Sequence, residues 1–216
     1  MRTVSQAVEE IVQRSPFLTE IISEGLANNA QVARKIQPDV EKRLLEKVSE
    51  ASISMALHRL SKDLQSPVFG ARLLKHISGI TVRSNLMQFV CPNASDLLHP
   101  LGKLSKLARN KEDMFLNFSR GLHESMLIIS RELEADVMSA IGHGKKFKKV
   151  EGLSAITMRL PEMTLNVPGV YYPILKAIGQ EGISLVEVVS VRTELSIILG
   201  DKDIDRAFSI IKKITT

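Results

Sequence analysis

The sequence predicts an α+β protein, with a helical N-terminal domain followed by two βαββα units that have antiparallel sheets. Apolar residues recur at helical spacing through the early part of the chain. A β-α-β-β-α order of strand-like and helical runs then occupies residues 150–216, and a looser version of the same order occupies residues 77–142. Repetition at this spacing indicates two stacked copies of one unit.

Residues 1–76 form the predicted helical domain. Two apolar runs with helical spacing flank Ser15-Pro16 (Val4, Val8, Ile11 and Val12, then Leu18, Ile21, Ile22 and Leu26). A third helix starts at Asn28 or Asn29, and Pro38 could start a fresh helix at Asp39 after its first turns. Ser49 is a favourable N-cap for a fourth helix that runs to Leu64.

These helices resemble a helix-turn-helix, with Ala30–Ile36 as the positioning helix and Ser49–Leu64 as the recognition helix. The outward polar side chains of the second helix are candidates for DNA contacts, because cations and hydroxyls bind phosphates and base edges (Ser52, Ser54, His58, Arg59 and Lys62). Two observations argue against DNA binding. Residues 1–70 carry nine Lys/Arg and nine Asp/Glu, so they have no net positive charge for phosphates, and the segment Gln37–Lys47 is longer than the usual turn of the motif. A helical docking or dimerisation domain is the alternative.

Residues 77–142 form the first predicted copy of the βαββα unit. Ile80–Arg83 echoes Ile156–Arg159, and Met126–Ile129 echoes Leu195–Ile198. A helix between them has one apolar face (Leu97, Leu98, Leu101 and Leu104), and residues 131–141 echo the last helix of the chain. We expect one long first strand here. The rival interpretation is a wing hairpin, Ile80–Arg83 with Leu86–Val90, that turns at Ser84-Asn85.

Residues 150–216 form the second predicted copy, after a basic run at 145–149 that is typical of a solvated linker. Its predicted elements, in order, are a strand at Ser154–Leu160, a loop at Asn166–Gly169, a helix at Val170–Gly182, strands at Ile183–Ser190 and Thr193–Leu199, and a helix from Asp201 to about Ile214. In the loop, free backbone N–H groups at a helix start attract anionic groups, and glycine lets a ligand approach closely.

This second copy resembles an ACT domain, the small regulatory module of aspartokinases. The resemblance rests on the Asn166-Val-Pro-Gly169 loop, Gly182-Ile183, Thr193-Glu194 and the helix start at Asp201–Ala207. It implies a ferredoxin-like fold and an amino-acid ligand held by the loop and the facing strand of a partner subunit. The implied ligand-binding residues are Asn166, Val167, Pro168, Gly169, Val170, Tyr171, Ser184 and Val186. In the first copy Pro92–Asp96 stands in place of the glycine loop, so the usual ligand is not expected there.

Composition narrows the classes of function. The 216 residues have no apolar run of 18, no signal-peptide pattern and one cysteine, Cys91, so we expect a cytoplasmic protein without membrane contact or internal disulfide. Cys91 itself reads as a small buried apolar residue. The five histidines lack metal-ligand spacing, no phosphate-binding Gly-rich loop precedes a lysine, and the kinase motifs of a complete aspartokinase are missing. We therefore expect neither catalysis nor a cofactor.

Three hypotheses follow from these patterns. The first is a regulatory sensor that forms a homodimer. Its pair of ACT domains binds a small-molecule ligand, expected to be an amino acid, and this binding repositions the N-terminal helices. The second is a ligand-responsive transcriptional regulator in which those helices bind DNA. The third is an assembly protein with neither ligand nor DNA. The net charge of +5 comes mainly from residues 71–149, which carry thirteen Lys/Arg against seven Asp/Glu.

Overall fold

The computed structural model describes residues 2–64, 73–93, 101–102, 105–106, 114–141 and 147–216. The chain divides into two compact units, Met1–Phe69 and Gly70–Thr216. Helices make up the first unit, and helices with an antiparallel sheet make up the second, so the predicted α+β fold class is confirmed. The predicted limits of the individual domains, at residues 76, 142 and 150, remain predictions. No described helix combines the length and apolar character that crossing a membrane requires.

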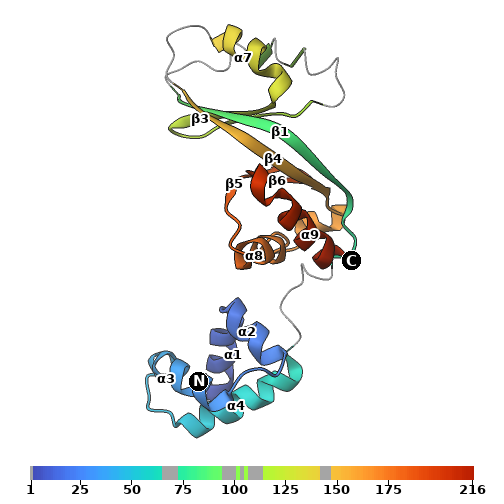
Figure 1. Cartoon of the computed structure of the whole chain (residues 1–216). Coiled ribbons are helices and arrows are strands. Elements are labelled where there is room, and N and C mark those ends of the chain that lie inside the picture. Colours follow the sequence, from blue (N-terminus) through green and yellow to red (C-terminus); the bar gives the residue numbers. More distant parts are fainter. Residues whose placement is uncertain (1, 65–72, 94–100, 103–104, 107–113, 142–146) are drawn as a thin grey trace. The chain divides into compact units, whose positions relative to one another are not determined.

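The first unit packs its helices around one apolar core (Figure 1). Its helices are α1 (Val4–Gln13), α2 (Pro16–Ser23), α3 (Asn29–Leu44) and α4 (Glu50–Asp63). Each helix begins at a side chain that accepts a hydrogen bond from the first turn, as its N-cap (Thr3, Ser15, Asn28 and Ser49). The apolar stripes of all four face inward, and Val8, Ile53 and Leu57 are fully buried.

Helix α3 continues through Pro38, so the expected fresh helix at Asp39 is wrong. Val32, Ile36 and Val40 continue one buried stripe across the proline, whose ring lies on the exposed side. This packing compensates for the hydrogen bond that Pro38 cannot donate. The helix ends at Leu45, in the left-handed conformation with φ 58°. The connection between α3 and α4 is therefore only residues 45–49. The expected connection of Gln37–Lys47 was too long for a helix-turn-helix, and this shorter one is not.

The carboxylate of Glu41 joins this connection to α3. Glu41 accepts hydrogen bonds from the backbone amide of Val48 at 3.2 Å and from Lys47 Nζ at 3.3 Å. The Val48 amide, followed by Lys47, lowers the pKa of the Glu41 carboxyl below its ordinary value. The ionised Glu41 thus fixes the start of α4 relative to the end of α3.

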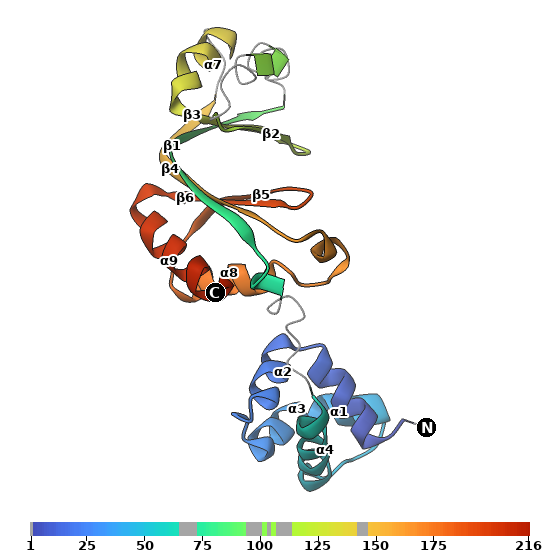
Figure 2. The ribbon, with the colours of Figure 1, turned by 90° about the vertical axis from the view of Figure 1, so that its right-hand side faces the viewer.

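The second unit contains one six-stranded antiparallel sheet in the order β2-β3-β1-β4-β6-β5 (Figure 2). Its strands are β1 (Ser78–Pro92), β2 (Leu116–Arg120), β3 (Glu124–Ser130), β4 (Lys148–Arg159), β5 (Leu185–Val191) and β6 (Glu194–Gly200). Its helices are α7 (Glu134–Ile141), α8 (Tyr172–Gln180) and α9 (Ile204–Thr215), with 3-10 turns η1 (Arg131–Leu133), η2 (Glu162–Asn166) and η3 (Asp201–Asp203). Both βαββα copies therefore contribute three strands to the same sheet.

The two central strands are shared reciprocally between the copies. Strand β1 pairs with β4 of the other copy from Ser78 to Val90, for example Thr81 with Thr157, whereas only its C-terminal half, from Leu86, also pairs with β3 of its own copy. Likewise β4 pairs with β6 only through its C-terminal half, whereas its pairing with β1 extends from Lys148 to Arg159. The core under α8 and α9 accordingly includes Ile80 of β1, and the core under α7 includes Phe147 at the start of β4.

Both shared strands are irregular at the point where their pairing passes from one copy to the other. In β1 the register shifts between Arg83 and Leu86, and Asn85 takes a φ of 63°. In β4 the matching position is Gly152, with a φ of 69°. Asparagine and glycine are the residues that tolerate this conformation best. The long first strand is therefore confirmed and the wing hairpin at Ser84-Asn85 is wrong, because the chain bulges there without turning back.

The predicted alignment of the repeats is wrong at the first strand, and at the third strand it is one residue out, because Met126 corresponds to Ser196 and not to Leu195. Ile80–Arg83 and Ile156–Arg159 are pairing partners in the sheet, not equivalent positions, and the segment that matches Ile156–Arg159 is 89–92. The predicted linker at 145–149 is also partly wrong, since β4 begins at Lys148. Of the predicted helix face after β1, only Leu101 lies within the described residues, and it packs against the core under α7. Leu97, Leu98 and Leu104 lie outside the described residues. Residues 94–96 of the predicted loop at Pro92–Asp96 also lie outside them.

Candidate functional site

The candidate site is the corner where β4 passes through η2 and a short loop into α8. Thr164 anchors η2, since its buried hydroxyl donates to the Pro161 carbonyl at 2.6 Å and its carbonyl accepts from the Val167 amide at 3.1 Å. Gly169 then takes a φ of 75°, which favours glycine, and no atom lies within 4 Å of where its Cβ would stand. Val170 is buried in the core below α8 and α9. The loop is thus held at both ends and open at its glycine.

A cavity of about 280 Å³ lies at this corner. It is lined by residues of η2, the loop, the start of α8 and the β5–β6 turn (Thr164, Leu165, Val167, Gly169, Val170, Tyr171, Tyr172 and Arg192). Four of the eight predicted ligand-binding residues are therefore brought together here, namely Val167, Gly169, Val170 and Tyr171. The volume is close to the lower end of the range for small-molecule sites, which suits a small metabolite.

Backbone amides make the corner attractive to an anion. Helix α8 starts at Tyr172 without a side-chain cap at Tyr171. Among the described residues, no backbone carbonyl accepts from the amides of Gly169, Val170 or Tyr171. Unpaired N–H groups that precede a helix carry partial positive charge, so a carboxylate placed here would gain hydrogen bonds and a favourable dipole.

Arg192 is a site residue that sequence reasoning missed. It sits in the turn between β5 and β6 with a φ of 54°. The Leu160 amide donates to the Thr193 carbonyl at 2.7 Å, which holds this turn against the end of β4. The Arg192 guanidinium contacts Glu162 at 3.2 Å, and both side chains are exposed. An exposed ion pair contributes little free energy, so Arg192 can exchange Glu162 for a ligand carboxylate at small cost.

Tyr171 joins the helix start to the sheet. Its hydroxyl shares a hydrogen bond with Ser190 Oγ of β5 at 2.9 Å. The ring of the neighbouring Tyr172 lies 6.0 Å from Lys176 Nζ. Both tyrosine rings remain more than a third exposed, so they border the cavity without filling it.

The other four predicted residues do not line the cavity. Asn166 and Pro168 are exposed on the outside of the loop. Ser184 is exposed just before β5, and Val186 packs with Leu86 in an apolar cluster on the sheet face that the helices leave free. Ser184 and Val186 were expected to act from a partner subunit, and that role stays a prediction.

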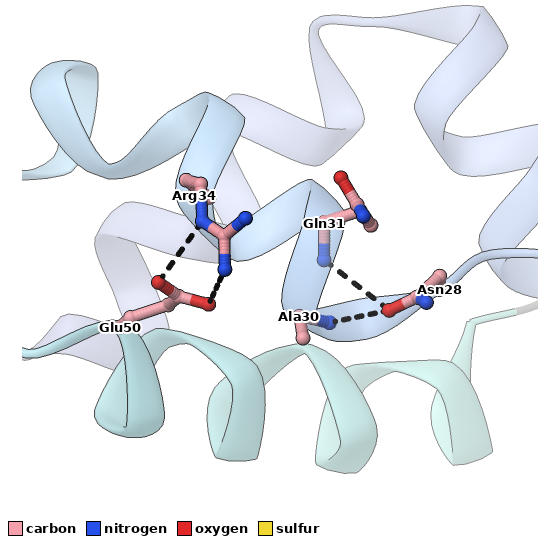
Figure 3. Close-up of polar contacts among 5 residues, drawn as sticks. All are labelled: Asn28, Ala30, Gln31, Arg34 and Glu50. Atoms are coloured by element: carbon pink, nitrogen blue, oxygen red, sulfur yellow. Dashed lines mark hydrogen bonds and ion pairs between the residues drawn. The ribbon is translucent and has the colours of Figure 1, made fainter.

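The predicted DNA-contacting residues lie along α4. Ser52, His58, Arg59 and Lys62 are exposed, whereas Ser54 is half-buried. The N-terminal end of α4 is tied to α3, because Arg34 binds Glu50 through two nitrogens at 3.1 and 3.3 Å (Figure 3). Asn28 caps α3 beside this pair by accepting from the amides of Ala30 and Gln31. Glu50 is thereby neutralised, and Arg59 and Lys62 have no acidic partner among the described residues.

Other chemistry finds little support in the part of the chain that the structure describes. No three His, Cys, Asp or Glu side chains gather there as metal ligands would. Cys91 is buried in β1 within the core under α7, in agreement with the prediction of a small apolar role. The groups that the Pro-Gly corner offers to a ligand are backbone amides, the Arg192 guanidinium and the rings of Tyr171 and Tyr172.

Comparison with known proteins supports the fold. No protein-family model and no curated protein matches the sequence. Among solved structures, the chain is similar to the aspartate kinase of Clostridium acetobutylicum, with 12% identity, a TM-score of 0.52 and coverage of 65% of this chain but only 35% of that one. It is also similar to the regulatory subunit of aspartate kinase from Thermus thermophilus in its ligand-free form, with 10% identity, a TM-score of 0.50 and coverage of 64% and 97%. The predicted ACT-like fold, of the aspartokinase regulatory type, is confirmed.

Proposed function

We propose that this chain is a non-catalytic regulatory protein that senses a small carboxylate-bearing metabolite, an amino acid, at the Pro-Gly corner. The observation that supports this most is the open cavity at Gly169, where unpaired amides and Arg192 converge. The carboxylate would bind the amides of Gly169–Tyr171 and the Arg192 guanidinium. Its side chain would lie against Leu165, Val167 and Tyr172, which line the same cavity.

In this proposal the protein acts as a cytoplasmic homodimer. Strand β5 ends the sheet, and its outer edge has no partner strand within the described residues. Val188 and Val191 on it are exposed. A second copy that pairs along this edge would bring its own Ser184, just before β5, and its Val186 near the first copy's corner, as the predicted ligand set requires.

Calorimetric titration of the full chain with each of the twenty amino acids tests the proposal. We expect at least one to bind, and Gly169→Ala to weaken that binding by about tenfold or more, because an alanine at φ 75° forces the loop to move. Gly179→Ala is the matched control, since Gly179 also has open space but lies within α8. Absence of binding at millimolar concentration, or an unchanged affinity in Gly169→Ala, would contradict it.

A second candidate function is DNA binding by the N-terminal unit. The observation that favours it is the exposed face of α4, where His58 and Arg59 are adjacent and Lys62 lies one turn further on. None of the three has an acidic partner among the residues described. The α3–α4 connection of residues 45–49 is also short enough for a helix-turn-helix. A helix of this kind positions cations for phosphates and polar groups for base edges.

Fluorescence anisotropy with a labelled duplex at several salt concentrations tests this second function. We expect affinity to fall as salt rises, and the slope of log K against log salt to shrink by about 2 in the Arg59→Ala/Lys62→Ala double variant. Lys47→Ala is the control, because Lys47 is already paired with Glu41. Binding that is absent, or that does not depend on salt, would remove DNA from the account.

A further inference from the structure

A second cavity lies on the face of the sheet that the helices leave free. Figure 2 shows the β2–β3 and β5–β6 hairpins projecting on the same side of the long β1 and β4 strands, with α7 and α8–α9 on the outer sides. Between the two hairpins lies a cleft of about 570 Å³. Its apolar lining residues are Val90, Pro92, Phe147 and Val150, and its polar ones are Gln88, Glu124, Lys148 and Glu187. This cleft is separate from the cavity at Gly169, which shares none of its lining residues.

Glu187 reaches this cleft because of a bulge in β5. The register of β5 against β6 shifts between Leu185 and Glu187, so Val186 is the extra residue. Glu187 consequently pairs with Ile198, whose side chain lies in the apolar cluster on the helix-free face. Its carboxylate Oε1 accepts a hydrogen bond from Gln88 Nε2 of β1 at 3.0 Å. Strands β1 and β5 are separated by β4 and β6 in the sheet, so this contact spans the cleft.

The Gln88–Glu187 pair leaves acceptors open toward the cavity. Gln88 is only 4% exposed, and its Nε2 donates to Glu187 and also contacts Met126 Sδ. No donor among the described residues reaches Gln88 Oε1, and none reaches Glu187 Oε2. Gln88 Oε1 is not sealed from solvent, so a ligand in the cleft can reach it, and the carboxylate beside it selects a cationic donor. An ammonium group carries several N–H donors and a positive charge, which satisfies both oxygens together.

Lys148 supplies the opposite charge at the other side of the cleft. It pairs with Val90 in the sheet, two residue pairs beyond the Gln88–Val150 pair and therefore on the same face. Its neighbour Lys149 is occupied by Glu134 and Glu151, whereas Lys148 has no acidic partner among the described residues. Lys148 is exposed and lines the cleft, so its ammonium group is available to an anion.

We propose that this cleft binds a small zwitterion, with the ligand ammonium on Gln88 Oε1 and Glu187, the ligand carboxylate on Lys148, and its apolar part against Val90 and Val150. This site is additional to the sensor site at the Pro-Gly corner, since it lies on the opposite face of the sheet. Its inner end offers the acceptors of Gln88 and Glu187, whereas the corner offers the donors of the backbone amides and Arg192. A ligand here contacts both copies of the repeat, because Gln88 belongs to the first and Glu187 to the second.

Amide chemical-shift mapping of the 15N-labelled full chain tests the cleft. The probes are the twenty amino acids, each added separately, and glycine betaine, a zwitterion whose nitrogen has no N–H. At least one amino acid is expected to shift the amides of Gln88, Val90 and Glu187. Betaine is expected to bind there about tenfold more weakly or not at all, because it cannot donate to Gln88 Oε1.

Matched variants separate this site from the Pro-Gly corner. Glu187→Gln and Lys148→Gln are each expected to weaken binding at the cleft by about tenfold, while Glu194→Gln, an exposed carboxylate on β6 outside both cavities, leaves it unchanged. Lys148 is exposed, so its variant keeps the fold even if Glu187→Gln disturbs it. Shifts confined to Gly169–Tyr171 would overturn the cleft proposal and leave the sensor standing. Cleft shifts that survive in both variants, or that are absent for every amino acid, would also overturn it.

Discussion

A fragment of residues 150–216, the predicted ACT domain by itself, is expected to be largely unfolded, whereas a fragment of residues 70–216 folds cooperatively. The reason is the reciprocal sharing of the central strands. In the intact chain the free edge of β4 is covered by the N-terminal half of β1, from Ser78 to Arg83. The core under α8 and α9 also contains Leu74, which is 3% exposed, together with Leu73, Ile77 and Ile80. None of these residues belongs to the fragment 150–216.

The size of this effect follows from what the short fragment loses. Burial of a large aliphatic side chain contributes about 1.5–3 kcal/mol, and a domain of this length is marginal even with its core complete. Loss of Leu74 with its three partly buried neighbours therefore removes a free energy comparable to the whole stability of a small domain. The edge of β4 would in addition expose unpaired amides and carbonyls to solvent or to other chains.

Circular dichroism and amide proton dispersion of the two fragments, at low micromolar concentration, measure the difference. The 70–216 fragment serves as the control, since it holds every strand of the sheet. If the short fragment, as a monomer, shows dispersed amide resonances and a cooperative thermal transition, β1 is dispensable. The sharing of strands between the copies would then contribute no free energy to the stability of the second copy.

Phe89→Ala is expected to destabilise the second unit by about 3–5 kcal/mol, the second large effect. Phe89 is fully buried on β1, in the core under α7. Its ring meets Phe147 edge to face, with centroids 5.5 Å apart and an interplanar angle of 61°. Phe147 precedes β4 and so comes from the other copy. Truncation of Phe89 both leaves a cavity and removes this contact between copies.

Urea unfolding of the 70–216 fragment and its variants measures this cost. A double-mutant cycle of Phe89→Ala with Phe147→Ala should give a coupling free energy of about 0.5–1.5 kcal/mol, the usual range for an aromatic pair. Leu122→Ala, at a position 87% exposed in the β2–β3 turn, is the control and should change stability by less than about 0.5 kcal/mol. Additive effects of the two phenylalanine variants would mean that the rings do not stabilise each other.

Local signals in the sequence predicted the elements well. The N-caps Asn28 and Ser49 mark the starts of α3 and α4, because a side chain that accepts a hydrogen bond from the first turn is a short-range feature. The two strands and two helices after Gly169 also lie within a few residues of their predicted ends. Pro38 misled the prediction because the buried stripe from Val32 to Val40 outweighs a local break.

Long-range features escaped prediction. Both halves of β1 have strand-like sequences, so nothing local shows that Ile80–Arg83 covers the core of the second copy while Leu86–Pro92 belongs to the first. The bulge at Val186 is a similar case, since a single extra residue in β5 decides which face Glu187 occupies. Arg192 was missed because an arginine in a tight turn has no distinguishing pattern. Its place in the site depends on the contact between the Leu160 amide and the Thr193 carbonyl.

The most direct test of the sensor is a crystal structure of the full chain grown with the amino acid that binds most tightly in calorimetry. The account predicts its carboxylate within hydrogen-bonding distance of the amides of Gly169, Val170 and Tyr171, with Arg192 turned from Glu162 toward the ligand. A corner that stays empty, or that the Tyr171 ring fills, while the amino acid is bound elsewhere, would contradict it.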